Sequence, residues 1–205
     1  MSLSEQEPRR RSIRRATPGV LTCPACAGPL KADAKWCPAC NFTGGDSMAM
    51  FSESPPPLLP ILDAAGLLKD EDIRKIESAR ESLRRRFPQF QWRVCTVVLP
   101  PDTSLPLFGF WLLNACPLHA DESADERAWT VLLLIDADSG QAAAVPGYAA
   151  EPFLSDDEWK AILSTMAKSW QSRRPAEAIV RFFETTRREL DFAWNRYGAR
   201  RPNRN

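Results

Sequence analysis

The most hydrophobic stretch of the chain is WTVLLLI, residues 129–135. A run of this kind, apolar almost throughout and partly β-branched, is typical of a strand that is buried on both faces. DADSG (136–140) follows it, and then a second apolar run, QAAAV (141–145). Because the connection is short and rich in turn-forming residues, we expect these two strands to pair as a hairpin in the centre of a sheet.

Helical patterns surround this hairpin on both sides in the sequence. Apolar residues at helical spacing predict a helix over 70–87, which Pro88 ends. The segment that follows, QWRVCTVVL (91–99), predicts a further buried strand. Ser155 and Glu158 have the spacing of a capping box and begin another helix, and Pro175 fits the first turn of a last one. The order of elements favours an α/β fold whose sheet is covered by helices on both faces.

Two segments between these elements have a less definite pattern. In PDTSLPLFGFWLLNAC (101–116), Pro106 and Gly109 argue against a regular helix through the middle, although Leu107–Leu113 has room for two turns. The acidic segment 121–126 is expected to be a loop. The only histidine, His119, lies beside this loop, where an exposed position is expected.

Composition divides the chain into segments of different character. Its 205 residues carry a formal net charge of +1, so the chain as a whole has no general attraction to polyanions. Arginines are concentrated at both ends, and Gly, Ser and Pro are concentrated after the cysteines. We therefore expect a disordered basic tail (1–20), a zinc ribbon (21–43), a linker (44–57), an α/β domain (58–197) and a second basic tail (198–205).

No apolar run is long enough to cross a bilayer, and the charged N-terminus is not followed by the hydrophobic core of an export signal. From this we expect a cytoplasmic protein without a membrane span. In a reducing compartment, clustered cysteines bind metal more often than they form disulfides.

The cysteines Cys23, Cys26, Cys37 and Cys40 form the repeated motif C-P-x-C, with ten residues between the two copies. Each copy offers two sulfurs on one short turn, and zinc favours four thiolates in a tetrahedron. A module of about 20 residues cannot bury enough surface to fold alone, so the metal must supply its stability. Redox-active Cys-x-x-Cys pairs would need strand-to-helix junctions, and loops surround these cysteines. The motif predicts a closed structural Zn²⁺ site.

This segment resembles the short zinc-ribbon modules of many prokaryotic proteins. Gly28-Pro29-Leu30, Ala34-Lys35-Trp36 and the second C-P-x-C occur in the expected order. The modules usually carry glycine after each second cysteine, whereas Ala27 and Asn41 occupy those positions here. Asn tolerates left-handed backbone geometry better than Ala does.

The larger domain resembles the TPM family, which includes thylakoid proteins linked to photosystem II repair and bacterial relatives. The similarity extends over about two-thirds of the chain. It is carried by Asp63-Ala-Ala-Gly66-Leu67-Leu68, the strand at 91–99, Trp129–Asp136, Pro146-Gly147-Tyr148 and Leu154-Ser155-Asp156. The resemblance implies a three-layer α/β/α sandwich. Relatives are described as calcium binders, and some as acid phosphatases.

The chain departs from the family in two respects. The family often has Gly-Tyr-Gly where this chain has Gly147-Tyr148-Ala149, and alanine enters positive-φ geometry less readily than glycine. Many relatives also carry an export signal and a membrane helix, which we do not find here. The family's envelope role is therefore not expected of this chain.

Carboxylates in the loops of this domain are candidate ligands for a hard cation. If the loops meet at one end of the sheet, Asp63, Glu151 and Asp156 could hold Ca²⁺. The alternative is local: Asp63 stabilises a turn, Ser155 caps a helix, and Asp156 with Asp157 complements the helix dipole. Asp136 and Asp138 have a similar local interpretation as residues of the hairpin turn.

Three functions are compatible with these patterns. The favoured one is a non-catalytic binding or assembly module that combines a zinc ribbon with a TPM-like domain and has an unknown protein partner. A metal-dependent phosphatase around Asp63 and Asp156 is the first alternative, but the sequence has no phosphate-binding loop or nucleophile elbow. Nucleic-acid binding by the ribbon and the arginine-rich tails is the second, and it is not favoured.

Overall fold

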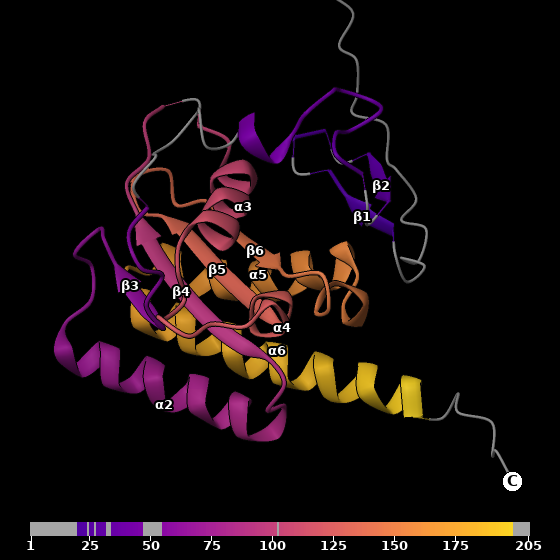
Figure 1. The fold of residues 1–205 in the computed structure, drawn as a ribbon. Coiled ribbons are helices and arrows are strands. Elements are labelled where there is room, and N and C mark those ends of the chain that lie inside the picture. The colour runs from indigo at the N-terminus through magenta and orange to yellow at the C-terminus, as the bar shows by residue number, and fades with distance from the viewer. Residues whose placement is uncertain are drawn as a thin grey trace, which may run out of the picture.

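The computed structural model describes residues 20–46 and 55–198, apart from positions 24, 27, 32, 33 and 102. Most of the two predicted basic tails and the middle of the predicted linker lie outside the described residues. The described part contains a small two-stranded sheet near the N-terminus and a four-stranded sheet with helices on both faces (Figure 1). This is the predicted α/β architecture.

The four-stranded sheet has the order β3-β4-β5-β6. Its strands are β3 (Ile61–Asp63), β4 (Gln91–Val97), β5 (Thr130–Asp136) and β6 (Ala142–Pro146). The first three are parallel, and β6 pairs with β5 in the antiparallel direction, which confirms the predicted hairpin. All residues of β5 are buried, as the hydrophobic run predicts. The short edge strand β3 was not predicted.

Alternate residues of β5 belong to two separate cores. Val131, Leu133 and Ile135 pack toward α2 (Asp70–Arg86), α5 (Asp156–Gln171) and α6 (Pro175–Gly198). Leu132 and Leu134 pack on the opposite face toward α3 (Leu105–Ala115). The sheet therefore has three long helices on one face and one on the other (Figure 1).

The two helical crossovers lie on opposite faces of the sheet. The connection from β3 to β4 contains α2, and the connection from β4 to β5 contains α3. Both move the chain in the same direction across the sheet. They must therefore have opposite hands, so one of them departs from the right-handed rule for parallel strands. This unusual arrangement leaves α3 as the only long helix on its face within the described residues.

Between β4 and β5, the argument against a regular helix and the expected acidic loop are both wrong, whereas the helical turns allowed for Leu107–Leu113 are present. Residues 105–115 form a continuous helix, because Pro106 occupies its first turn, where no backbone donor is needed, and Ser104 caps it. The expected acidic loop contains a short helix, α4 (Ala124–Ala128). Ser123 and Glu126 form its capping box, so these acidic residues define a helix start.

Candidate metal centre

The four sulfurs of Cys23, Cys26, Cys37 and Cys40 lie within 4.8 Å of one another. The Cys23 and Cys40 sulfurs are 3.8 Å apart, and those of Cys26 and Cys37 are 3.6 Å apart. A tetrahedron with Zn–S bonds of about 2.3 Å places its sulfurs about 3.8 Å apart. The cluster thus fits a metal ion with the size and ligand preference of zinc. The predicted four ligands gather in one place.

Two similar turns bring the sulfurs together. The Cys23 N–H donates to the Gly28 carbonyl at 2.8 Å, and the Cys37 N–H donates to the Phe42 carbonyl at 2.9 Å. Each turn thus spans six residues, counted from its first cysteine. Strands β1 (Val20–Thr22) and β2 (Pro29–Lys31) pair in the antiparallel direction and hold the first turn. The two C-P-x-C motifs therefore form one repeated structural unit.

Asn41 completes the second turn in the left-handed conformation, with φ of 59°. Its N–H donates to the Cys37 carbonyl at 2.8 Å. Asparagine is one of the few non-glycine residues that adopt this geometry readily. This agrees with the expected replacement of glycine by Asn41, whereas Ala27 lies outside the described residues.

The neighbouring thiols have different proton affinities. Burial raises the pKa of Cys37, but the N–H groups of Ala39 and Cys40 outweigh it and lower that pKa to about 7. The Phe42 N–H lowers the pKa of Cys40, but burial and the adjacent sulfurs outweigh it and raise that pKa to about 12. The neighbouring sulfurs therefore make ionisation of Cys40 harder. A bound metal ion offsets this effect, because metal binding displaces the thiol protons.

Four thiolates complete a tetrahedral coordination sphere and leave no position for a reacting water. The chemistry of this donor set is that of a structural site. Zinc bound there would hold the two turns together and would not activate a substrate.

The three candidate calcium ligands are not brought together. Asp63 is the last residue of β3, opposite Thr96, at the end of the sheet where the parallel strands finish. Glu151 and Asp156 come after β6, whose last residue, Pro146, pairs with Val131 near the start of β5. They therefore lie at the opposite end of the sheet. Among the described residues, the four cysteines are the only group of three or more potential ligands that meets the distance requirement for a metal.

Asp63 has the local role that was the alternative to calcium binding. Its carboxylate accepts hydrogen bonds from the N–H of Leu67 at 3.1 Å and from the N–H of Leu68 at 2.8 Å. The Thr96 hydroxyl donates to the same carboxylate. These hydrogen bonds fix the turn that leads from β3 to α2. Both carboxylate oxygens of Asp63 already accept hydrogen bonds within the chain.

Asp136 is the last residue of β5 and lies at the same end of the sheet as Asp63. Its carboxylate also forms local hydrogen bonds. It accepts from the N–H groups of Leu99 and Asp138, each at 3.3 Å, and from the Ser139 hydroxyl at 2.5 Å. Burial raises the pKa of Asp136, but these hydrogen bonds outweigh it and lower the pKa. This carboxylate stabilises the hairpin turn, as its local interpretation predicted.

Glu151 and Asp156 lie close enough to influence each other. Burial, and to a smaller extent the charge of Asp156, raise the pKa of Glu151 to about 7. Ser155 caps α5 and forms a capping box with Glu158, which confirms its predicted role. His119 is exposed, as expected, with Nε2 at 3.3 Å from a Glu126 oxygen.

The described residues form at least two hollows at the surface. A cavity of about 420 Å³ lies between α3 and the ends of β3 and β4, and its lining is mostly apolar, including Leu62, Val97 and Trp111. None of its described lining residues is a carboxylate, histidine or arginine. It therefore offers no carboxylate or imidazole ligands for the metal ions of a metal-dependent phosphatase.

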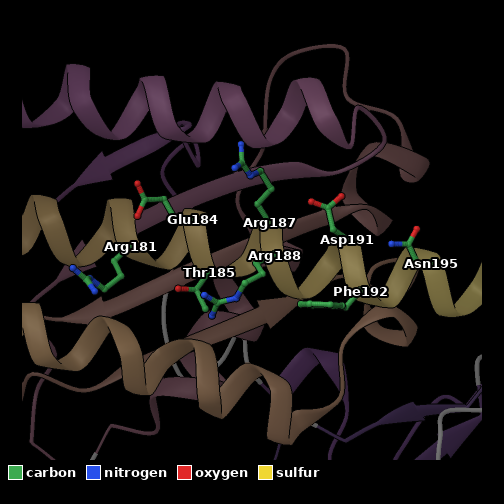
Figure 2. A pocket seen from close by; sticks show the side chains of 8 residues that line it. All are labelled: Arg181, Glu184, Thr185, Arg187, Arg188, Asp191, Phe192 and Asn195. Carbon is green, nitrogen blue, oxygen red and sulfur yellow. The ribbon is translucent and has the colours of Figure 1, made fainter.

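The second hollow, of about 440 Å³, follows α6 between α2 and α5 (Figure 2). Arg187 and Asp191 lie on the side of α6 that faces α2, and Asp191 pairs with Arg86 at 2.8 Å (Figure 2). Arg181 and Arg188 lie toward α5 (Figure 2). Because acidic side chains alternate with these arginines, the groove does not present the continuous basic field that nucleic acid requires.

A comparison with known proteins supports the predicted fold of the larger domain. The model of the family described as the TPM domain matches residues 61–189. No curated protein matches the chain. Among solved structures, the N-terminal domain of a protein from P. gingivalis is similar, with a TM-score of 0.51 and 19% identity over 66% of this chain and 83% of that one. The N-terminal domain of the cg2496 protein from Corynebacterium glutamicum has a TM-score of 0.50 and 14% identity, over 68% and 86% of the two chains. At these identities the likeness supports the fold alone.

Proposed function

The chain belongs to the TPM-domain family, and we propose that it is a non-catalytic binding module whose zinc-stabilised ribbon contacts a partner protein. The proposal rests on the closed four-sulfur cluster, which leaves no open coordination position. A site of this kind can stabilise a surface but has no means of turning over a substrate.

The ribbon presents a suitable contact residue beside the metal centre. Trp36 precedes the buried ligand Cys37, and 58% of its surface is exposed. An exposed tryptophan on a rigid support is a typical centre of a protein–protein interface, because it buries a large area at a small entropic cost. Lys35 lies next to it and is also exposed. We infer that the ribbon surface around Trp36 contacts the partner.

The two other functions lack a supporting observation in the described residues. The carboxylates proposed for phosphatase chemistry lie at opposite ends of the sheet. Asp63 accepts hydrogen bonds within its own turn, and Asp156 belongs to the first turn of α5. The α6 groove has mixed charge. Among the described helices, none has the length and apolar composition of a membrane span.

Elemental analysis of the purified chain tests the metal site. We expect one zinc ion per chain, and we expect its loss in Cys37→Ser. Wild-type protein that is purified under reducing conditions without zinc would contradict the proposal.

The partner surface is tested by quantitative crosslinking in cells with Trp36→Ala. Val98→Ala is the matched control, because Val98 is 60% exposed but belongs to the α/β domain. We expect crosslinked proteins that are lost in Trp36→Ala and kept in Val98→Ala. Zinc content must be equal in both variants. A crosslinking profile that Trp36→Ala leaves unchanged would exclude this surface.

A further inference from the structure

The two cysteine turns of the ribbon are equivalent in backbone but differ in one side chain. Gly28 and Phe42 occupy the same position, each accepting a hydrogen bond from the N–H of the first cysteine of its turn. A Cβ on Gly28 would lie 3.2 Å from the Cys26 sulfur, so the first turn keeps this position close to the metal centre. The first turn forms without any side chain here. The benzyl group of Phe42 is thus not required by the turn itself.

The Phe42 ring contacts helix α3. Its centroid lies 6.0 Å from that of Phe110, with an angle of 72° between the rings. This is the favourable edge-to-face arrangement of two aromatic rings. Both residues are half-buried. The contact joins the ribbon to the α/β domain, and Figure 1 shows the ribbon segment next to α3.

Helix α3 is fixed to the sheet on one side and meets the ribbon on another. A Cβ on Gly109 would lie 2.7 Å from Cγ2 of Val145, so the helix backbone approaches β6 closely. Phe110, the next residue, contacts Phe42. Because α3 is the only long helix described on this face of the sheet, the ribbon adds a second layer where the cover is thinnest.

We propose that the outer surface of α3 is the docking surface for the metal-loaded ribbon, with Phe42 as its anchor. The inference rests on metal binding at the four cysteines. Without the four metal–sulfur bonds the ribbon is too small to hold its turns. Phe42 then separates from Phe110, and the side of α3 that carries Phe110 becomes exposed to solvent. The backbone hydrogen bonds of α3 then open more often. Occupancy of the metal site is thereby transmitted to the α/β domain.

Amide hydrogen exchange of the full chain tests this coupling. We expect removal of zinc by a chelator to speed exchange in 105–115 by about three- to tenfold, the size of an aromatic pair's contribution. Exchange in 175–189, within α6 on the other face of the sheet, should stay unchanged. Phe42→Ala should reproduce the α3 effect while it retains zinc. Phe110→Ala should release the ribbon in the same way and speed exchange at 37–43.

Trp36→Ala is the matched control, because it removes an exposed aromatic residue of the same ribbon. It should leave exchange in α3 unchanged. If Phe42→Ala retains zinc and α3 exchanges as in the wild type, the docking inference is wrong while the metal site and the proposed function stand. If the wild-type chain binds no zinc, both fail.

Discussion

Gly109 and Val145 are in such close contact that a Cβ atom on the glycine would lie 2.7 Å from Cγ2 of the valine. The same atom would lie 3.3 Å from Cδ2 of Leu134. Gly109 therefore faces both β5 and β6. It allows α3 to lie closer to the sheet than a side chain would permit, and this sets the position of the helix that the ribbon contacts.

Gly109→Ala should destabilise the domain by about 1–2 kcal/mol. Alanine is the better helix former by up to about 1 kcal/mol, but overpacking costs about 1–3 kcal/mol. Val145 is β-branched and cannot easily turn away. The measurement is the midpoint of urea unfolding. Gly44→Ala is the control, because its Cβ would meet no atom within 4 Å. Unchanged or increased stability in Gly109→Ala would show that α3 can move outward freely.

Arg127→Ala should weaken the C-terminal end of α3. The Arg127 guanidinium donates to the carbonyl of Leu113 and, at 3.2 Å, to the carbonyl of Cys116, and it pairs with Glu122. Removing it leaves these helix-end carbonyls without their donor, at a cost of about 1–3 kcal/mol.

Chemical unfolding and hydrogen exchange at 112–118 measure the effect of Arg127→Ala. Arg85→Ala is the control, since Arg85 is exposed. Equal losses in the two variants would mean that the arginine contributes only general surface charge.

The elements that could be predicted are those with local signals. The capping-box spacing of Ser155 and Glu158 predicts the start of α5, and the apolar run at 129–135 predicts β5. The metal site could be predicted for the same reason, because each pair of cysteines lies within one short turn. The helix at 105–115 could not, because Gly109 is selected by its contact with Val145, which is distant in sequence. Strand β3 has only three residues, and its pairing with β4 defines it.

The carboxylates show why proximity of loops is harder to predict. Whether Asp63 and Glu151 meet depends on the relative direction of β3 and β6. The hairpin prediction gave the direction of β6 relative to β5, but β3 was not recognised as a strand. Since β3 is parallel to β5 and β6 is antiparallel to β5, the chain leaves β3 and β6 at opposite ends of the sheet. The two carboxylates therefore lie at opposite ends as well. The contact between Phe42 and Phe110 likewise had no signal in the sequence.

Asp63→Ala should lower stability by about 1–3 kcal/mol, equally with and without calcium. The variant loses the acceptor for the N–H groups of Leu67 and Leu68 and for the Thr96 hydroxyl. Thermal unfolding in calcium and in chelator measures both values. Asp157→Ala is the control, because 84% of the Asp157 side chain is exposed. A wild-type melting temperature that rises in calcium, and does not rise in Asp63→Ala, would reveal a cation site that the geometry does not indicate.

Glu151→Gln should reduce the pH dependence of stability. Burial, and then the charge of Asp156, raise the pKa of Glu151 from 4.5 to about 7. Between these values the folded chain binds more protons than the unfolded chain, so stability falls as the pH rises. The full penalty is present above pH 7 and absent below pH 4.5. Because the side chain is only partly buried, solvent reduces the penalty to roughly 1–2 kcal/mol.

Urea unfolding at pH 4.5 and at pH 8 tests this expectation. Glutamine keeps the size of the side chain and carries no charge, so Glu151→Gln should be more stable than the wild type at the higher pH and nearly equal to it at the lower. Glu184→Gln, at an exposed position of α6, should follow the wild type at both. If Glu151→Gln loses as much stability between the two pH values as the wild type does, another group is responsible for the pH dependence. Glu151 would then ionise in the folded chain as it does in water.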